Sequence, residues 1–378
     1  VALGHSALEN QNFTGNNEAY NVAVGYSAGN DITTGTLNTL VGGLTGDALT
    51  TGADNTALGM AALGNDTKGN KAVAVGEGAL HNQNFTTSTD NYNVAVGFDA
   101  GNDITTGVQN TLIGALAGDA LTDADYNVAV GYTALSADTL GSRSTALGYA
   151  ALQVQNFTSA TDAYNSAVGF HAGYQISTGQ QNTIIGGLAG DALGDADFNV
   201  AVGVSALGAD TKGSQSVAIG NSALGAQNFT SATNSLNTAV GFQAGAAVTT
   251  GVQNTLIGGL AGDAMTDATR NVAVGYAALT ESTASDNTAV GWAALTTASS
   301  GNASVAVGRS ALGAMTTGGS NVAVGYLAAD AVTSGNNNVA IGAGTLSANT
   351  VGDRNVAIGS QALAVYNPAS NEDSYNVA

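Results

Sequence analysis

The pentapeptide Asn93-Val94-Ala95-Val96-Gly97 is the stretch that decides the fold, because close variants of it recur along the entire chain. The pattern is Asn-[Val/Thr/Ser]-[Ala/Leu/Ile]-[Val/Ile/Leu]-Gly, and its last residue, here called the marker glycine, occurs in 21 copies. One long interval and three shorter, equal intervals separate Gly4, Gly25, Gly42, Gly59 and Gly76, and this 72-residue super-repeat recurs as far as Gly241. Such regular spacing indicates a stack of similar short units in place of ordinary globular domains.

The residue types within the motif predict a short strand. Val94 and Val96 lie two positions apart and therefore point to one side of a strand, whereas Ala95 points to the other. Apolar residues on both faces are typical of a buried strand. A second alanine follows three residues after most marker glycines and precedes a polar turn. Seventeen residues accommodate two short strands and two turns, which predicts an all-β parallel β-roll or β-solenoid of about 21 coils, each of 17 or 21 residues.

The spacing also predicts how the chain is organised. The segment 1–274 forms a β-roll with a 72-residue super-repeat of four coils, and the segment 275–378 continues the roll with near-regular 16–17-residue coils. The chain begins and ends inside copies of the motif. We therefore expect it to be a segment of a longer fibre at both ends.

Two columns of residues stand out when the coils are aligned. The asparagine four residues before the marker glycine is expected to stack along the roll and to hydrogen-bond up and down it. The middle strand position is alanine in most copies and a large residue once per super-repeat. This pattern suggests that the large residues form layers that fill a narrow shared space. The stacked asparagines include Asn21, Asn38, Asn55, Asn93, Asn110 and Asn127, and the middle positions include Ala23, Leu40, Ala57, Ala95, Leu112, Ile184 and Leu256.

The longer coils carry an Asn-Phe-Thr sequence in their four-residue insertions, and its phenylalanines are Phe13, Phe85, Phe157 and Phe229. Longer loops at a fixed site of a solenoid often form a binding face, so these loops are candidate surface-binding loops. The alternative, which we favour, is that each phenylalanine folds back to cover its own coil. Aromatic residues directly after the marker glycine, such as Tyr132 and Trp292, are interpreted as packing residues.

Composition and charge exclude several classes of function. The formal net charge of −20, with 27 acidic and 7 basic residues, argues against nucleic acid and against insertion into membranes. There is no cysteine, and the three histidines His5, His81 and His171 occupy different offsets from the marker glycine, so no catalytic constellation or cofactor site is predicted and we expect no enzyme. Calcium remains an alternative at aspartates that recur once per super-repeat: Asp47, Asp119, Asp191 and Asp263.

The motif resembles the head repeats of YadA-like trimeric autotransporter adhesins. The resemblance lies in Asn-Val-Ala-Ile-Gly at residues 338–342 and 355–359, and in Ser-Val-Ala-Ile-Gly at residues 216–220, and it covers effectively the whole chain. Variants such as Thr-Thr-Gly-x-x-Asn-Thr-Ala-Val-Gly are also similar to repeats of bacteriophage tail fibres. The coils here are longer than those of the adhesin heads.

The resemblance implies three chains, each a left-handed parallel β-roll, packed as a homotrimeric fibre. It implies that the column of Ala23, Leu40, Ala57, Ala95, Leu112, Ile184 and Leu256 faces neighbouring chains. The function it implies is an extracellular adhesin or spacer on a bacterial cell surface, with an unknown cell-surface, matrix or glycan ligand. The alternatives are a tail fibre of a virion and a monomeric solenoid that binds ions or ice.

Overall fold

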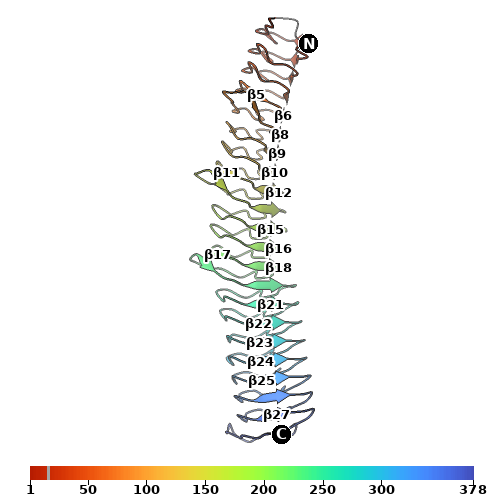
Figure 1. Ribbon diagram of the computed structural model, residues 1–378, viewed down its shortest axis with the longest axis vertical. Helices are drawn as coiled ribbons and strands as arrows, with labels where there is room; N and C mark the ends of the chain where they lie inside the picture. The colour runs from red at the N-terminus through yellow and green to blue at the C-terminus, as the bar shows by residue number, and fades with distance from the viewer. Residues whose placement is uncertain (15–17) are drawn as a thin grey trace. The chain divides into compact units, whose positions relative to one another are not determined.

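The computed structural model describes residues 1–14 and 18–378, and it contains two units, Val1–Leu188 and Ala189–Ala378. Within each unit the chain winds into successive coils whose strands pair in parallel, and the described residues form strands and turns but no helix (Figure 1). The predicted all-β parallel β-solenoid is therefore confirmed, as is the count of about 21 coils.

The first unit contributes one main strand from each of its coils. Each main strand is the central part of the repeated pentapeptide and pairs with its counterpart in the next coil. These strands are β1 (Ala2–Leu3), β2 (Val22–Val24), β3 (Thr39–Val41), β4 (Thr56–Leu58), β6 (Val73–Val75), β8 (Val94–Val96), β9 (Thr111–Ile113), β10 (Val128–Val130), β12 (Thr145–Leu147), β14 (Ser166–Val168) and β15 (Thr183–Ile185).

The second unit repeats this arrangement. Its main strands are β16 (Val200–Val202), β18 (Val217–Ile219), β20 (Thr238–Val240), β21 (Thr255–Ile257), β22 (Val272–Val274), β23 (Thr288–Val290), β24 (Val305–Val307), β25 (Val322–Val324), β26 (Val339–Ile341) and β27 (Val356–Ile358). The looped coils add small two-stranded sheets on another side of the coil: β5 (Gly69–Asn70) with β7 (Thr89–Asp90), β11 (Gly141–Ser142) with β13 (Thr161–Asp162), and β17 (Gly213–Ser214) with β19 (Thr233–Asn234).

Strand pairing is in strict register, so equivalent residues of successive coils stack. Ala95 of β8 pairs with Ala74 of β6 on one side and with Leu112 of β9 on the other. The marker glycines stack in the same way. Gly97 has a φ of 148°, and a Cβ placed on it would lie 2.4 Å from the carbonyl oxygen of Gly114. Only glycine fits there, which explains why the marker position is glycine in every coil.

The second strand predicted in each coil does not form in the plain coils. The chain that follows the marker glycine turns repeatedly, because alternate residues adopt left-handed conformations, as at Asp99 (φ 50°) and Gly101 (φ 58°). The backbone groups still bond to neighbouring coils: Asp99 N donates to Glu77 O over 2.9 Å and Gly101 N to Ala117 O over 3.0 Å. This side of the coil is therefore a stack of hydrogen-bonded turns and only locally a sheet.

Candidate functional site

The predicted asparagine ladder is present and lies inside the coils. Asn93 Nδ2 donates to Gly107 O of its own coil over 2.8 Å, and Asn93 Oδ1 accepts a bond from the backbone N of Asn110 in the next coil over 2.9 Å. Asn110 repeats the pattern with Ala124 O and with the backbone N of Asn127. Each amide thus satisfies one carbonyl of its own turn and one N–H of the following coil, which couples turn geometry to stacking.

The middle strand column points into the interior of its own coil. Ala23, Leu40, Ala57, Ala95, Leu112, Ile184 and Leu256 all have a relative exposure of 0% within a single chain. No surface of these side chains is left for a second chain to contact. The prediction that this column faces neighbouring chains in a trimer is therefore wrong, and the column is part of the core.

The large residues of this column fill space that glycines leave open. Gly101 and Gly118 occupy a position that is leucine in other coils, such as Leu80 and Leu135. A Cβ on Gly101 would lie 2.6 Å from Leu112 Cδ1, and one on Gly118 would lie 2.8 Å from Leu112 Cδ2. One leucine therefore occupies the volume above two glycines, which keeps the interior filled.

The insertion phenylalanines are core residues. Phe85, Phe157 and Phe229 are each 5% exposed, and Phe13 in the first coil is half-buried. A Cβ on Gly69 of the preceding coil would lie 2.9 Å from the Phe85 ring, which shows how closely the ring packs. The phenylalanines therefore fold back onto the coil, and their side chains do not form the candidate binding face of these loops.

A buried polar network, which we did not predict, holds the looped coils of Phe85, Phe157 and Phe229. Asp66 is fully buried, and its Oδ1 accepts bonds from the backbone N of Gly69 (3.0 Å) and of Phe85 (3.2 Å). Its Oδ2 accepts a bond from Gln83 Nε2 over 2.6 Å, and Gln83 Oε1 in turn accepts a bond from Asn93 Nδ2 over 2.8 Å. Burial raises the pKa of Asp66, against the opposing effect of these hydrogen bonds.

The network recurs with the super-repeat. Asp138 and Gln155 take the same positions in the next looped coil, where Gln155 Nε2 donates to Asp138 Oδ2 (2.5 Å) and to Ser144 Oγ (3.0 Å). Gln155 Oε1 accepts a bond from Asn165 Nδ2 over 2.8 Å. Gln155 thus links Ser144 to Asn165 at the point where serine replaces asparagine in the ladder. The sequence signal was available, because Asp-Thr-x-Gly recurs once per super-repeat with a glutamine at the equivalent position of the next coil.

The outward residues of the main strands form the strand face, defined as the positions one and three residues before each marker glycine. These side chains are valine, isoleucine, leucine, threonine or serine in every copy, and none is charged although the chain has 27 acidic residues. Ile113 is 40% exposed, Ile257 40% and Leu147 44%. Each unit therefore presents an uncharged and largely apolar face to the solvent.

A second outward column follows the marker glycine directly and is called the corner column. Its aromatic residues are not part of the core, since Tyr132 and Trp292 are each 50% exposed. Their packing is with one another across coils: the rings of Tyr132 and Tyr149 lie 5.6 Å apart, and those of Tyr149 and Phe170 lie 5.4 Å apart. Where aromatic residues follow one another, as from Tyr132 to Phe170, the corner column is therefore an exposed stack of rings on the outside of the coils.

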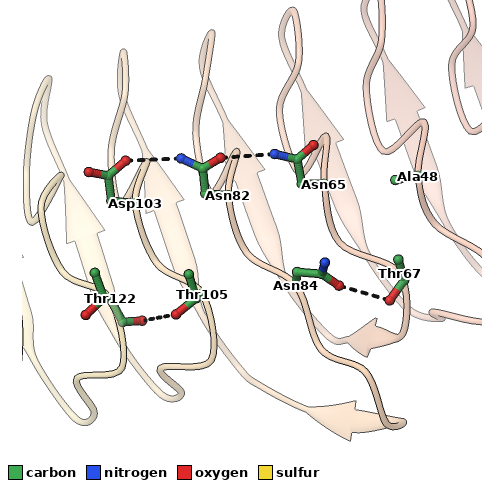
Figure 2. A pocket seen from close by; sticks show the side chains of 8 residues that line it. All are labelled: Ala48, Asn65, Thr67, Asn82, Asn84, Asp103, Thr105 and Thr122. Carbon is green, nitrogen blue, oxygen red and sulfur yellow. Dashed lines mark hydrogen bonds between the residues drawn. The ribbon is translucent and has the colours of Figure 1, made fainter.

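A polar groove of about 680 Å³ runs along one side of the first unit. Figure 2 shows two rows of side chains along it, in which Asn65 donates to Asn82 (3.0 Å), Asn82 donates to Asp103 (3.1 Å) and Thr105 donates to the carbonyl of Thr122 (3.1 Å). Its lining residues are Ala48, Asn65, Thr67, Asn82, Asn84, Asp103, Thr105 and Thr122. The rows offer amide, carboxylate and hydroxyl groups at the spacing of the coils.

The recurrent aspartates are half-buried and lie at the end of the turn that follows the marker glycine. One carboxylate oxygen of Asp119 and one of Asp263 are buried without a hydrogen-bond partner. Burial is the main cause that raises the pKa of Asp119 to about 6, and the nearby charges of Asp103 and Asp99 add to it. Burial also raises the pKa of Asp47 and Asp263. Among residues 1–14 and 18–378, no group of three or more His, Asp or Glu side chains is arranged to hold a metal ion.

The stacked coils, the asparagine ladder and the repeated core define the chain as a parallel β-solenoid repeat protein. Comparisons of the sequence with protein-family models and with curated proteins gave no match. The described part of the chain holds no helix with the length and hydropathy to cross a bilayer.

Proposed function

We propose that this chain is a structural and adhesive segment of an extracellular fibre, in which copies of the chain associate side by side as a homotrimer. The observation that carries the proposal is the strand face. An apolar face without a single charge, in a chain of net charge −20, marks a surface that is covered in the working protein.

A second copy of the same chain is the occupant that fits this face best. The strand face continues from coil to coil within each unit at a constant register, so its partner must present apolar side chains with the same spacing. Another copy of the chain supplies that spacing without any adjustment. The resemblance of the motif to trimeric adhesin heads favours three copies, and it favours a bacterial cell surface as the location.

The sides that remain outside such an assembly are available for adhesion. They carry the polar groove and the looped coils, with amide, hydroxyl and carboxylate groups that suit a cell-surface, matrix or glycan ligand. The proposal assigns no catalytic reaction to the chain.

The mass of the assembly in solution tests the proposal, measured by light scattering. We expect a trimer for the wild type and a monomer for the double variant Ile219→Asp with Ile257→Asp, because paired charges in the strand face would be buried without partners. The matched control is Gln215→Asp with Gln253→Asp, which adds the same charges to exposed positions of the same two coils and should stay trimeric. A monomeric wild type would overturn the proposal.

A further inference from the structure

The corner column is interrupted at regular intervals. Once in each super-repeat the residue after the marker glycine is small, and these residues are Gly43, Ala115, Gly187 and Gly259. Ala115 lies between the coils of Phe98 and Tyr132, and Gly259 lies between those of Phe242 and Tyr276. At Ala115 and Gly259 the corner column therefore lacks a ring between two flanking rings, whereas Gly43 and Gly187 each have a ring on one side only.

At the glycine interruptions the backbone is not crowded by neighbouring atoms. A Cβ on Gly259 would meet nothing closer than the Tyr276 ring at 3.6 Å, and one on Gly43 nothing closer than Tyr26 O at 4.0 Å. The flanking rings are two coils apart, which is about 10 Å at the usual spacing of strands. A planar group midway would therefore lie about 5 Å from each ring, the usual distance for stacking.

The second unit shows which kind of group fits such a position. In the coil of Arg309 the corner column holds a guanidinium group instead of a ring. Its Cζ lies 5.0 Å from the centre of the Trp292 ring and 5.6 Å from that of the Tyr326 ring. Four other basic residues form ion pairs with aspartates, but among the described residues Arg309 forms none. Two aromatic rings therefore hold this guanidinium by stacking.

Each of the two interrupted coils at Ala115 and Gly259 also carries a half-buried aspartate, and the uninterrupted coil of Tyr326 carries a similar one, Asp330. Asp119 follows Ala115 by four residues and Asp263 follows Gly259 by four residues, and each has a buried oxygen without a hydrogen-bond partner. That position lies close to the corner column, as another coil shows: the His171 ring contacts both the Phe170 ring (4.1 Å) and the Tyr174 ring (4.7 Å), and Tyr174 stands at the offset of these aspartates. A cation in the gap would thus approach a carboxylate.

We propose that the gaps at Ala115 and Gly259 are slots that bind arginine side chains of a partner protein. The guanidinium would stack between the two flanking rings and pair with the aspartate of the same coil. Arginine fits better than lysine, because its planar group can stack on both rings while it donates hydrogen bonds to a carboxylate. The inference rests on the proposed adhesive function and names the chemistry of its partner, a protein surface with exposed arginines.

The test uses a labelled hexa-arginine peptide and variants that close or open a slot. Ala115→Arg with Gly259→Arg places a guanidinium in both gaps, as Arg309 does naturally, and should weaken peptide binding at least about tenfold. The matched control is Gln109→Arg with Gln253→Arg, which adds the same charge at exposed positions of the same coils and should weaken binding less than about twofold. Asp263→Asn should weaken binding to the Gly259 slot.

The opposite variant, Arg309→Ala, should create an additional gap between two rings, which tests stacking alone because Gly313 stands at the offset of the aspartates. Trp292 is the only tryptophan of the chain and forms one wall of this new gap. Its fluorescence should therefore change on addition of hexa-arginine in Arg309→Ala and stay constant in the wild type. This fluorescence response can be measured even if the slot-filling variants do not fold.

The inference would be overturned by hexa-lysine binding as tightly as hexa-arginine, by slot-filling variants binding like their control, or by Trp292 fluorescence that does not respond in Arg309→Ala. A neutral peptide rich in tyrosine that binds as tightly as hexa-arginine would also overturn it, since the slots would then select rings. The mass of each variant is measured in parallel. A trimeric protein that does not bind the peptide would overturn only the proposal of arginine slots. A monomeric protein that binds the peptide through the slots would overturn only the proposal of a trimer.

Discussion

Coils that precede a four-residue insertion differ from plain coils at one interior position, seven residues after the marker glycine. In the coil that precedes an insertion, this position holds a buried polar acceptor: Asp66, Asp138 or Asp210. In plain coils of the C-terminal part, the same position holds apolar residues such as Met315 and Val332. The insertion is therefore coupled to a buried group one coil earlier that binds the N–H groups of the loop.

The end of the chain keeps only part of this coupling. Asn355 and Asn376 are 21 residues apart, and Asn376 Nδ2 donates to Asn355 Oδ1 over 2.9 Å, so the final coil again carries an insertion and departs from the predicted spacing of 16 or 17. The preceding coil has Asn349 at the interior position, whose Oδ1 accepts a bond from Gly352 N over 2.8 Å. Asn349 thus repeats the bond of Asp66 to its own turn, but Pro368 stands in the place of Phe85 and has no N–H to donate, so the bond to the inserted loop is missing.

The largest effect should come from a carboxylate placed where no donors are present. Ala95→Asp puts a charge into the closed interior, and we expect a loss of about 5 kcal/mol in the free energy of unfolding, or failure to fold. Urea unfolding followed by circular dichroism measures it. Ala95→Ser serves as the control and should cost much less. A folded Ala95→Asp protein of unchanged stability would show that this column is open to water.

The next effect should come from removal of the acceptor that holds a loop. Asp138→Ala leaves Gly141 N, Phe157 N and Gln155 Nε2 without their acceptor, and we expect a loss of about 4 kcal/mol. Asp138→Asn keeps an acceptor oxygen and should lose less. Met315→Leu at the same position of a plain coil should cost under about 1.5 kcal/mol. If Asp138→Ala and Met315→Leu cost the same in urea titrations, the loop does not depend on the carboxylate.

The third effect concerns the apolar filling of the plain coils. Leu112→Ala should cost about 3 kcal/mol, because it opens a cavity above Gly101 and Gly118. Gly118→Leu should recover part of that loss in the double variant, since Leu135 adopts the same left-handed conformation at the equivalent position (φ 56°, against 57° for Gly118), although Leu121 Cδ1, 2.8 Å from the new Cβ, must shift. A double-mutant cycle of unfolding free energies checks the rescue. Additive losses would contradict the exchange of volume between the two positions.

The smallest effect concerns the half-buried Asp119, whose pKa is raised to about 6. Its ordinary pKa is about 3.9, so folding favours the protonated form, and the stability gained from protonation is complete below pH 3.9 and lost as pH rises through 6. Asp119→Asn should therefore raise the unfolding midpoint by roughly 1 °C at pH 7. The gain should shrink as the pH falls to 4. A gain that is the same at both pH values would exclude titration of Asp119 as its cause.

The sequence predicted the repeat and what stacks along it, because strand register and the asparagine column follow directly from residue spacing. It predicted the side of the Ala95 column wrongly. Two apolar faces on a three-residue strand look alike in a sequence, and only the closed coil shows that alanine faces inward while Val94 and Val96 face outward. The Asp66 network was also missed, since an aspartate in a polar turn gives no sign of burial until Gln83 and Phe85 are folded over it.

The asparagine ladder has one more consequence, which concerns how the chain opens. The ladder is interrupted by Ala72, Ser144, Ser216 and Ser304, so it runs in short blocks such as Asn93, Asn110 and Asn127. Within a block each amide orders the turn of its own coil and the first N–H of the next, so neighbouring coils open together. At an interruption the asparagine link is missing, and the coils stay joined by the pairing of the main strands and by side chains such as Gln155. Thermal opening that starts in one block can therefore stop at the next interruption, and the solenoid can lose one segment while those beyond it stay wound.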